Sequence, residues 1–167
     1  MKKPVGIVIG SESDLPVIEE TTKILDFFKI GYELTISSAH RSPKRTIDYA
    51  QNAKKKGFKV LIVGAGAAAH LAGIIAAETT LPVIGIPINS SPLQGIDSLL
   101  STVQMPGGVP VAAMAVGKAG ARNAGIFAAQ ILSIKDPKVG EKMRLYKKKL
   151  AKEVEIKANN LKNRKAK

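Results

Sequence analysis

Short runs rich in apolar and β-branched residues alternate along this chain with segments in which apolar residues recur every three or four positions. The short runs predict buried strands at residues 5–9, 32–37, 60–63, 83–86 and 111–116. The periodic segments predict helices at residues 15–28, 43–56, 71–79, 95–102 and 119–132. A further helix begins at Pro137 and continues into a basic terminal segment. Strand and helix therefore alternate from the first strand to the last.

This alternation predicts a parallel sheet with helices on both faces, a three-layer α/β/α sandwich. Strands that are apolar along most of their length are typical of sheets covered on both sides. Five strands suit a flavodoxin-like five-stranded parallel sheet. We expect a flavodoxin-like catalytic domain at residues 1–134. The basic helix at residues 135–167 is expected to pack on that domain or on a neighbouring subunit and not to form a separate domain.

The amino-acid composition indicates how large a core the protein can form and which kinds of site it can contain. The length of 167 residues and the hydrophobic content of 45% suit one domain with a real core. The chain has no cysteine, which excludes disulfides and thiolate metal sites and is compatible with a reducing compartment. The sequence has neither an apolar signal core near Met1 nor an apolar segment long enough to cross a bilayer. We therefore expect a cytoplasmic protein without a membrane partner.

The formal net charge of +13 is concentrated at one end of the chain. Residues 135–167 hold thirteen Lys or Arg against four Asp or Glu, a net charge of +9. This segment has a single aromatic residue, Tyr146, and no recognition motif. The pattern favours a solvated helix face and a frayed end over a nucleic-acid arm, which is the minor alternative. We expect no nucleic-acid partner.

Polar residues gather in three loops that follow predicted strands. In open parallel sheets, ligands bind beyond the carboxyl ends of the strands, close to the point where the strand order reverses. The loops at residues 10–14, 37–43 and 64–70 lie at such ends, and they contain both histidines of the chain. These loops are the predicted site.

The first loop is a candidate phosphate site because it immediately precedes a helix. The hydroxyls of Ser11 and Ser13 and free backbone N–H groups can meet an anion there. Arg41 in the next loop can bind the same phosphate in a bidentate manner, and Asp14 is suited to accept hydrogen bonds from sugar hydroxyls. The alternative is that Ser13 or Asp14 only caps the helix.

His40 is the candidate acid and base, since an imidazole can give and accept a proton near neutral pH. It stands beside Arg41 at a strand end. His70 opens or caps the third helix, and either a role in the site or a structural role is open for it.

Residues 64–69, Gly-Ala-Gly-Ala-Ala-Ala, match a relaxed dinucleotide fingerprint. That fingerprint needs an acidic residue at the end of the next strand, and residues 85–89 contain none. Glycine and alanine here are better explained as an uncovered backbone that a flat ring can approach closely. No Walker lysine follows a glycine-rich turn, and two histidines without clustered carboxylates make a poor metal site. We therefore expect neither a dinucleotide cofactor nor a metal at this loop.

Four motifs stand in an order and at spacings shared with a known family. They are Gly-Ser-Glu-Ser-Asp at residues 10–14, Ser-Ala-His-Arg-Ser-Pro at residues 38–43, Gly-Ala-Gly with Ala-His-Leu at residues 64–71, and Asp-Ser-Leu-Leu-Ser with Val-Gln-Met-Pro at residues 97–106. Over residues 5–132 the chain resembles the N5-carboxyaminoimidazole ribonucleotide mutases, class I of the phosphoribosylaminoimidazole carboxylase catalytic subunit family.

The resemblance implies an isomerase of de novo purine biosynthesis that needs no cofactor. The carbamate of the substrate would lose CO2 in a closed pocket, and C4 of the imidazole would capture the same molecule. His40 would protonate the departing nitrogen and later take the proton from C4. Phosphate and ribose would be held by Ser11, Asp14 and Arg41. The base and CO2 pocket would be lined by Ser38 and Ala39 and by the backbone of Gly66, Ala67 and Leu71, with His70 open between a place in this lining and a structural role.

The resemblance also implies a homo-octamer with shared active sites and a functional link to the ATP-dependent carboxyaminoimidazole ribonucleotide synthase. The small residues of the predicted helix at 119–132 permit close helix packing between subunits, although a core role explains them equally well. Residues 104–110 would form a loop over a neighbouring site, the alternative being a plain Pro/Gly connection.

Three positions depart from the family pattern: Ser42 stands where threonine is usual, Ala67 where glycine is usual, and Ala72 where proline is usual. Serine keeps the hydroxyl. If position 67 needs a positive φ, alanine would cost about 1 kcal/mol there. None of the three removes a proposed acid, base or phosphate ligand.

Two rival functions remain at this point. A carboxylase of the same fold would use free CO2 in place of the carbamate. A flavodoxin-like ligand-binding, signalling or electron-transfer module belongs to a different class, and the chain lacks the clustered strand-end aspartates that a receiver domain needs.

Overall fold

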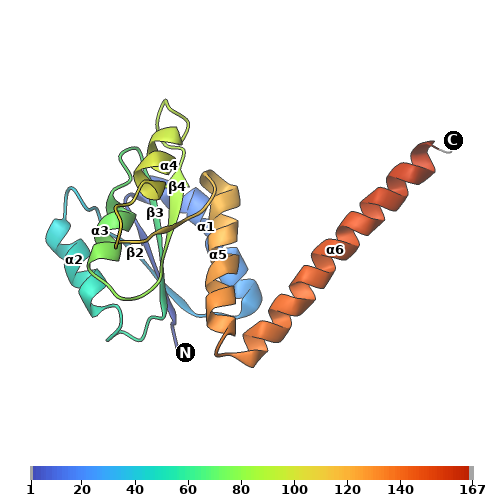
Figure 1. Ribbon diagram of the computed structural model, residues 1–167, viewed down its shortest axis with the longest axis horizontal. Coiled ribbons are helices and arrows are strands. Elements are labelled where there is room, and N and C mark those ends of the chain that lie inside the picture. The colour runs from blue at the N-terminus through green and yellow to red at the C-terminus, as the bar shows by residue number, and fades with distance from the viewer. Residues whose placement is uncertain (1, 166–167) are drawn as a thin grey trace.

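The computed structural model describes residues 2–165, and within them five parallel strands alternate with helices (Figure 1). The strands are β1 (Val5–Ile9), β2 (Tyr32–Ile36), β3 (Val60–Gly66), β4 (Val83–Ile88) and β5 (Ala112–Ala113). The helices are the 3₁₀ turn η1 (Glu12–Asp14), α1 (Leu15–Phe28), α2 (Pro43–Asn52), α3 (Leu71–Ala77), α4 (Ile96–Val103), α5 (Gly117–Ser133) and α6 (Pro137–Lys165). The predicted order of elements is confirmed.

The strands form one sheet in the order β2-β1-β3-β4-β5. This is the flavodoxin-like winding, in which the strand order reverses between β1 and β3. Ile9 at the end of β1 pairs with Ile36 of β2 on one side and with Gly64 of β3 on the other. The carboxyl ends of these three strands therefore lie side by side, and the loops that follow them emerge at one edge of the sheet.

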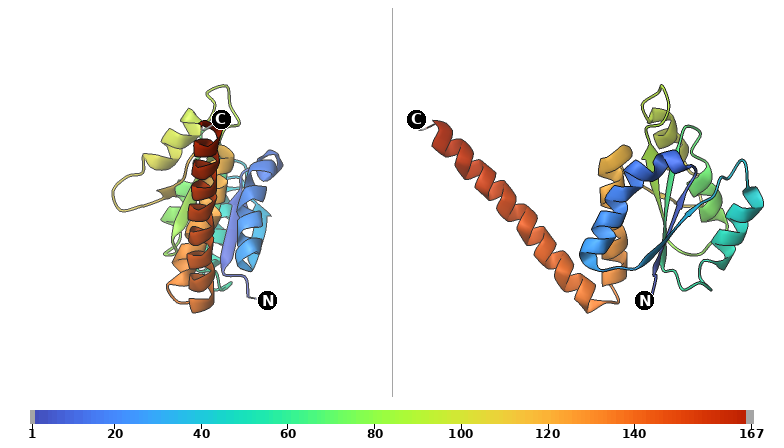
Figure 2. Two further views of the ribbon diagram at one scale, coloured as in Figure 1. Left: turned by 90° about the vertical axis from the view of Figure 1, so that its right-hand side faces the viewer. Right: turned by 180° about the vertical axis from the view of Figure 1, so that it is seen from behind.

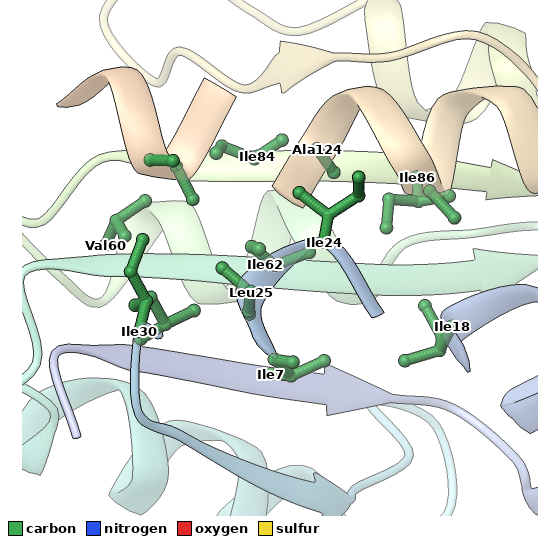
Figure 3. Packing of buried hydrophobic residues seen from close by; sticks show 14 of the residues in the cluster. Ile7, Ile18, Ile24, Leu25, Ile30, Val60, Ile62, Ile84, Ile86 and Ala124 are labelled. Carbon is green, nitrogen blue, oxygen red and sulfur yellow. The ribbon is translucent and has the colours of Figure 1, made fainter. Parts of the chain in front are cut away.

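Alternate side chains of the central strands enter two separate cores. Ile7, Ile62 and Ile84 point toward α1 and α5, where they pack on Ile24 and Leu25 (Figure 3). Their strand neighbours, such as Val8 and Leu61, enter the second core on the opposite face, under α2 and α3. Both faces of the sheet are thus covered, which explains why the central strands lack an alternating polar pattern.

Small residues bring α1 and α5 into close contact. Thr21 of α1 is fully buried and donates a hydrogen bond from Oγ1 to the carbonyl oxygen of Ala121, at 2.7 Å. A Cβ placed on Gly125 would lie 2.9 Å from Cβ of Ile24 and 3.0 Å from the carbonyl oxygen of Thr21. The alanines and glycines of α5 are therefore used within the subunit to pack α5 on α1.

Element ends differ from the predicted ones where pairing or turns override the local pattern. Helix α2 ends at Asn52, four residues earlier than predicted, because the chain then turns through Gly57 at φ 91°. β3 and β4 are longer than predicted because they pair with each other as far as Gly66 and Ile88. β5 is reduced to two residues, since it is an edge strand that pairs with β4 at only two positions.

Helix α6 buries side chains against the domain in its first turns. Tyr146 makes edge contacts with Phe27 and Phe28 of α1, at centroid distances of 5.7 and 5.6 Å, and Met143 is buried nearby. Residues 147–163 are all exposed, and Figures 1 and 2 show this part of α6 extending away from the domain. Over residues 2–165, the structure contains no helix both long and apolar enough to cross a membrane.

The α1–α5 contact yields a test of close packing with two glycines. Gly125→Ala should lower the free energy of unfolding by about 1–2 kcal/mol, because the added methyl must displace Ile24 and the α1 backbone. Gly140→Ala in α6 is the matched control, since its Cβ would meet its nearest neighbours at 3.8 and 3.9 Å. That variant should gain about 0.5–1 kcal/mol from helix propensity. Urea unfolding of both variants measures the difference, and equal effects would contradict the packing argument.

Candidate functional site

The loops at the carboxyl edge of the sheet enclose a crevice of about 320 Å³. Four strands contribute to it, because the loops that follow β1, β2, β3 and β4 all reach this edge. The lining residues are Gly10, Ser11, Ser13, Asp14, Ser38, Ala39, His40, Arg41, Ala65, Gly66, Ala69, His70, Leu71 and Ser90. Ten of the eleven predicted site residues are therefore brought together. Ala67 lies outside the crevice, exposed on the adjoining loop.

Ser11 organises the first loop as the cap of η1. Its Oγ accepts hydrogen bonds from the backbone N–H and the hydroxyl of Ser13, at 3.4 and 2.9 Å. The carboxylate of Asp14 accepts from the backbone N–H of Ser11 at 3.1 Å, which completes a capping box. Ser11, and not Ser13 or Asp14, is thus the capping residue at the start of this helical segment.

Asp14 is a buried carboxylate beside the crevice, with only 4% of its surface exposed. Burial raises its pKa above the ordinary value, and hydrogen bonds from the backbone N–H groups of Ser11 and Gly10 offset part of that rise. A buried acceptor of this kind gains from donors such as sugar hydroxyls, which replace the lost solvent without adding charge.

Arg41 connects the second loop to the first. Its Nη2 donates to the carbonyl oxygen of Gly10 at 3.4 Å, and its backbone N–H donates to Oγ of Ser38 at 3.2 Å. The side chain stays exposed, so the remaining guanidinium N–H groups can meet an anion. The charge of Arg41 therefore lies beside the Ser11 loop, as the sequence predicted.

His40 and His70 form a direct pair across the crevice. Nε2 of His40 lies 2.8 Å from Nδ1 of His70, and the two rings meet edge to face. Two imidazolium rings would present N–H groups to each other, so this hydrogen bond requires at least one neutral ring. His70 stands at the N-cap position of α3, yet within the described chain its side chain makes no capping bond. The pair therefore consists of one hydrogen-bond donor and one acceptor, the groups that acid and base chemistry requires.

The β3–α3 loop forms the floor of the crevice from nearly bare backbone. A Cβ on Gly66 would lie 1.8 Å from Oγ of Ser90, so any larger residue here would displace the Ser90 side chain. Ala67 and Ala69 have φ values of 52° and 31°, in the left-handed region that favours glycine. The strain foreseen for Ala67 is therefore present, and it lies outside the crevice wall.

Four lining residues were not predicted: Gly10, Ala65 and Ala69, which lie within the predicted loops, and Ser90, which lies outside them. Ser90 follows β4, so the rule that ligands lie beyond strand ends would have included it, but the preceding loops alone were rich in charged and imidazole groups. The arrangement as a whole offers an anion-binding guanidinium, a buried carboxylate and a histidine pair around one small space. Within residues 2–165, no three His, Asp or Glu side chains gather as metal ligands.

Comparisons with known proteins agree on one family. The family described as AIR carboxylase matches residues 4–153. The chain is 54% identical over 157 residues to the N5-carboxyaminoimidazole ribonucleotide mutase of Thermotoga maritima, covering 94% of this chain and 91% of the relative. It is 54% identical over 143 residues to the mutase of the same name from Bacillus subtilis, covering 86% of this chain and 88% of the relative.

Solved structures show the same likeness in three dimensions. The crystal structure of Treponema denticola PurE superimposes with a TM-score of 0.86 at 26% sequence identity. The superposition covers 95% of this chain and 98% of that one. The architecture is thus retained at a much lower identity than that of the mutases above.

The buried carboxylate gives a prediction about stability and pH. Asp14→Asn should raise the melting temperature of the ligand-free protein near pH 7, because a neutral amide avoids the cost of a buried charge. The folded pKa of Asp14 is raised above its unfolded value near 4, so the penalty exists at pH values above both and disappears as pH falls toward 4. The gain in melting temperature should therefore shrink on acidification.

Thermal melts of both proteins from pH 4 to pH 8 make the measurement. Asp26→Asn, which replaces an exposed aspartate of α1, controls for the loss of one charge. A gain that is absent at pH 7, or equal at every pH, would contradict the cost assigned to the buried carboxylate.

Proposed function

Because the chain belongs to the AIR carboxylase family, we propose that its crevice converts N5-carboxyaminoimidazole ribonucleotide to 4-carboxy-5-aminoimidazole ribonucleotide. The protein is an isomerase of purine biosynthesis. The single observation that carries the assignment of the site is the position of His40, an imidazole held in the same crevice as Arg41 and Ser11. A proton-transferring group and an anion-binding group thus face one small space.

The substrate is bound through its phosphate and ribose. Arg41 and the hydroxyls of Ser11 and Ser13 hold the phosphate, and the carboxylate of Asp14 accepts hydrogen bonds from the ribose. Ser38, Ala39 and the backbone of the β3–α3 loop line the base. Held in this way, the heterocycle lies with its reacting edge toward His40.

The reaction rearranges the substrate, so substrate and product have the same atoms. The bond between the carbamate carbon and the nitrogen breaks, CO2 is released within the crevice, and His40 donates a proton to that nitrogen. C4 of the ring then attacks CO2, and His40 takes the proton that leaves C4. His40 therefore ends in the protonation state in which it began. Confinement of CO2 and orientation of the ring supply much of the acceleration.

His70 supports His40 through the hydrogen bond of 2.8 Å between their rings. This contact fixes the ring orientation and one nitrogen of His40, which leaves its other nitrogen for the substrate. We assign His70 to the site as the partner of the acid and base.

The crevice is open in a single subunit, and the proposed assembly closes it. We propose a homo-oligomer, in keeping with the octamer that the family resemblance implies, in which residues 104–110 cover a neighbouring site. Apolar side chains of α4 are free for such contacts: Leu100 is 51% exposed and Val103 is 50% exposed. Light scattering of the full chain measures the mass of the assembly. We place the enzyme in the cytoplasm, functionally linked to the ATP-dependent synthase that makes its carbamate.

Substrate preference separates this function from its close rival. The purified protein should turn over the carbamate rapidly and should not turn over aminoimidazole ribonucleotide with bicarbonate at a comparable rate. Rapid use of the second mixture without the first would identify a carboxylase that uses free CO2. A yellow protein with flavin absorbance would favour an electron-transfer module.

His40→Asn tests the proposed acid and base. Turnover of the carbamate should fall by roughly 10²–10⁴-fold, because general acid and base catalysis is typically worth that factor. Ribonucleotide affinity should change little, since the phosphate ligands remain. Arg41→Ala is the complementary variant and should chiefly weaken binding. Titration calorimetry and single-turnover kinetics separate the two effects, and turnover of His40→Asn within about tenfold of the parent would refute the role of His40.

A further inference from the structure

Ser42 occupies the N-cap position of α2 without capping it. Pro43 follows it at the first helical position, the usual sequence of a helix start, yet in the described structure the Ser42 side chain makes no capping hydrogen bond. Its hydroxyl turns backward instead. Oγ donates to the carbonyl oxygen of Ser38 at 3.0 Å and accepts from the backbone N–H of Ser38 at 3.2 Å. The hydroxyl therefore closes the loop that carries His40 and Arg41.

The backbone of Ser42 contacts a pair of buried hydroxyls, those of Ser37 and Thr46. Oγ1 of Thr46 is 2.8 Å from Oγ of Ser37 and also donates to the carbonyl oxygen of Ser42 at 3.3 Å. Thr46 is fully buried and Ser37 is 2% exposed. The backbone N–H of Ser37 donates to the carbonyl oxygen of Ile9 at 2.9 Å, which attaches this pair to the end of β1. The loop is thus anchored to the sheet on one side and to α2 on the other.

The contacts of Ser42 also continue through Ser38 to Arg41, the proposed phosphate ligand. Oγ of Ser38 accepts from the backbone N–H of Arg41 at 3.2 Å and faces its Nε at 3.5 Å. Nη2 of Arg41 continues to the carbonyl oxygen of Gly10. His40 lies inside this loop, between two residues that the hydroxyls hold.

We propose that Ser42 and Thr46 are positioning residues, whose hydroxyls form a clasp that fixes His40 and Arg41 against the crevice. The proposal rests on the function proposed above. The physical argument is that the five-residue loop at 38–42, whose His40 and Arg41 are exposed, would have many conformations if it were unconstrained, whereas the reaction requires His40 and the phosphate ligand at a set distance. Hydrogen bonds of the clasp restrict the conformations of the loop. The Ser42 hydroxyl, which could have capped α2, makes two of these bonds.

The clasp explains why serine serves at position 42. Serine and threonine both present a hydroxyl at Cβ, so either closes the loop, whereas alanine cannot. Thr46 has a narrower requirement: valine has its shape but leaves the buried hydroxyl of Ser37 without its partner. The two positions therefore allow substitutions that remove a hydroxyl with little change in volume.

Four variants test the clasp, with two matched controls. Ser42→Ala and Thr46→Val should lower kcat on the carbamate by roughly 10- to 100-fold, because small displacements of reacting groups have effects of this size. Ser42→Thr and Thr46→Ser keep the hydroxyls and should stay within about threefold of the parent. Thr21→Val removes a buried hydroxyl between α1 and α5, and Ser133→Ala removes a helix hydroxyl bonded to Gln130. Both controls should retain the parent kcat even where they lower the melting temperature.

NMR of the histidine rings tests the clasp without measuring turnover. The sequence has two histidines, so histidine labelled with ¹⁵N in the ring yields ring signals from His40 and His70 alone. In Ser42→Ala and Thr46→Val the His40 signals should shift or broaden relative to the parent, and in Thr21→Val they should not. If the parent is inactive on the carbamate, the proposed function fails, while the ring signals still decide the clasp. Parent-like kcat and parent-like ring signals in both clasp variants would overturn the proposal.

Discussion

The parallel hydrogen-bond ladders that join β1 to β2 and β3 are the constraint on which the rest of this structure depends. Ile9 pairs with Ile36 and with Gly64, so β1 and β2 end level with each other and β3 continues for two more residues, to Gly66. The loops that follow these strands therefore all lie at the same edge of the sheet. Arg41 reaches Gly10, and His40 reaches His70, because the ladders have already brought their backbones together. The crevice is a consequence of strand register.

Close packing on both faces of the sheet stabilises that register. Isoleucine, leucine and valine fill both faces of the central strands, and Figure 3 shows those of the face under α1 and α5. Alanines and glycines of α5 let it approach α1 closely. The rigid body that results carries loops held by local hydroxyl and backbone bonds, as in the Ser11 capping box and the contacts of Ser42. The positions of the side chains in the crevice are therefore set both by the register of the sheet and by hydrogen bonds within the loops.

Parts of the fold and of the site could be read from the sequence because their signals are local. The apolar run of β1 and the periodic pattern of α1 predicted both elements with the observed bounds. Residues such as Ser11 and Arg41 were found because they follow predicted strands. The end of α2 and the two-residue β5 were not predicted, since they depend on a turn at Gly57 and on the pairing of an edge strand. Ser90 also follows a predicted strand, but it was missed because residues 89–95 contain no charged residue or histidine.

The sequence by itself determined the alternating architecture, the three loops that line the crevice and the residue types available in them, since each depends on neighbours within a few positions. Only the tertiary structure decided that His40 is paired with His70, that Asp14 is buried, and that the hydroxyl of Ser42 serves the loop in place of the helix. These properties are distances and exposures between groups that belong to different elements or compete for the same partner. A linear pattern specifies which groups exist, whereas hydrogen-bond geometry and burial arise only when the elements pack.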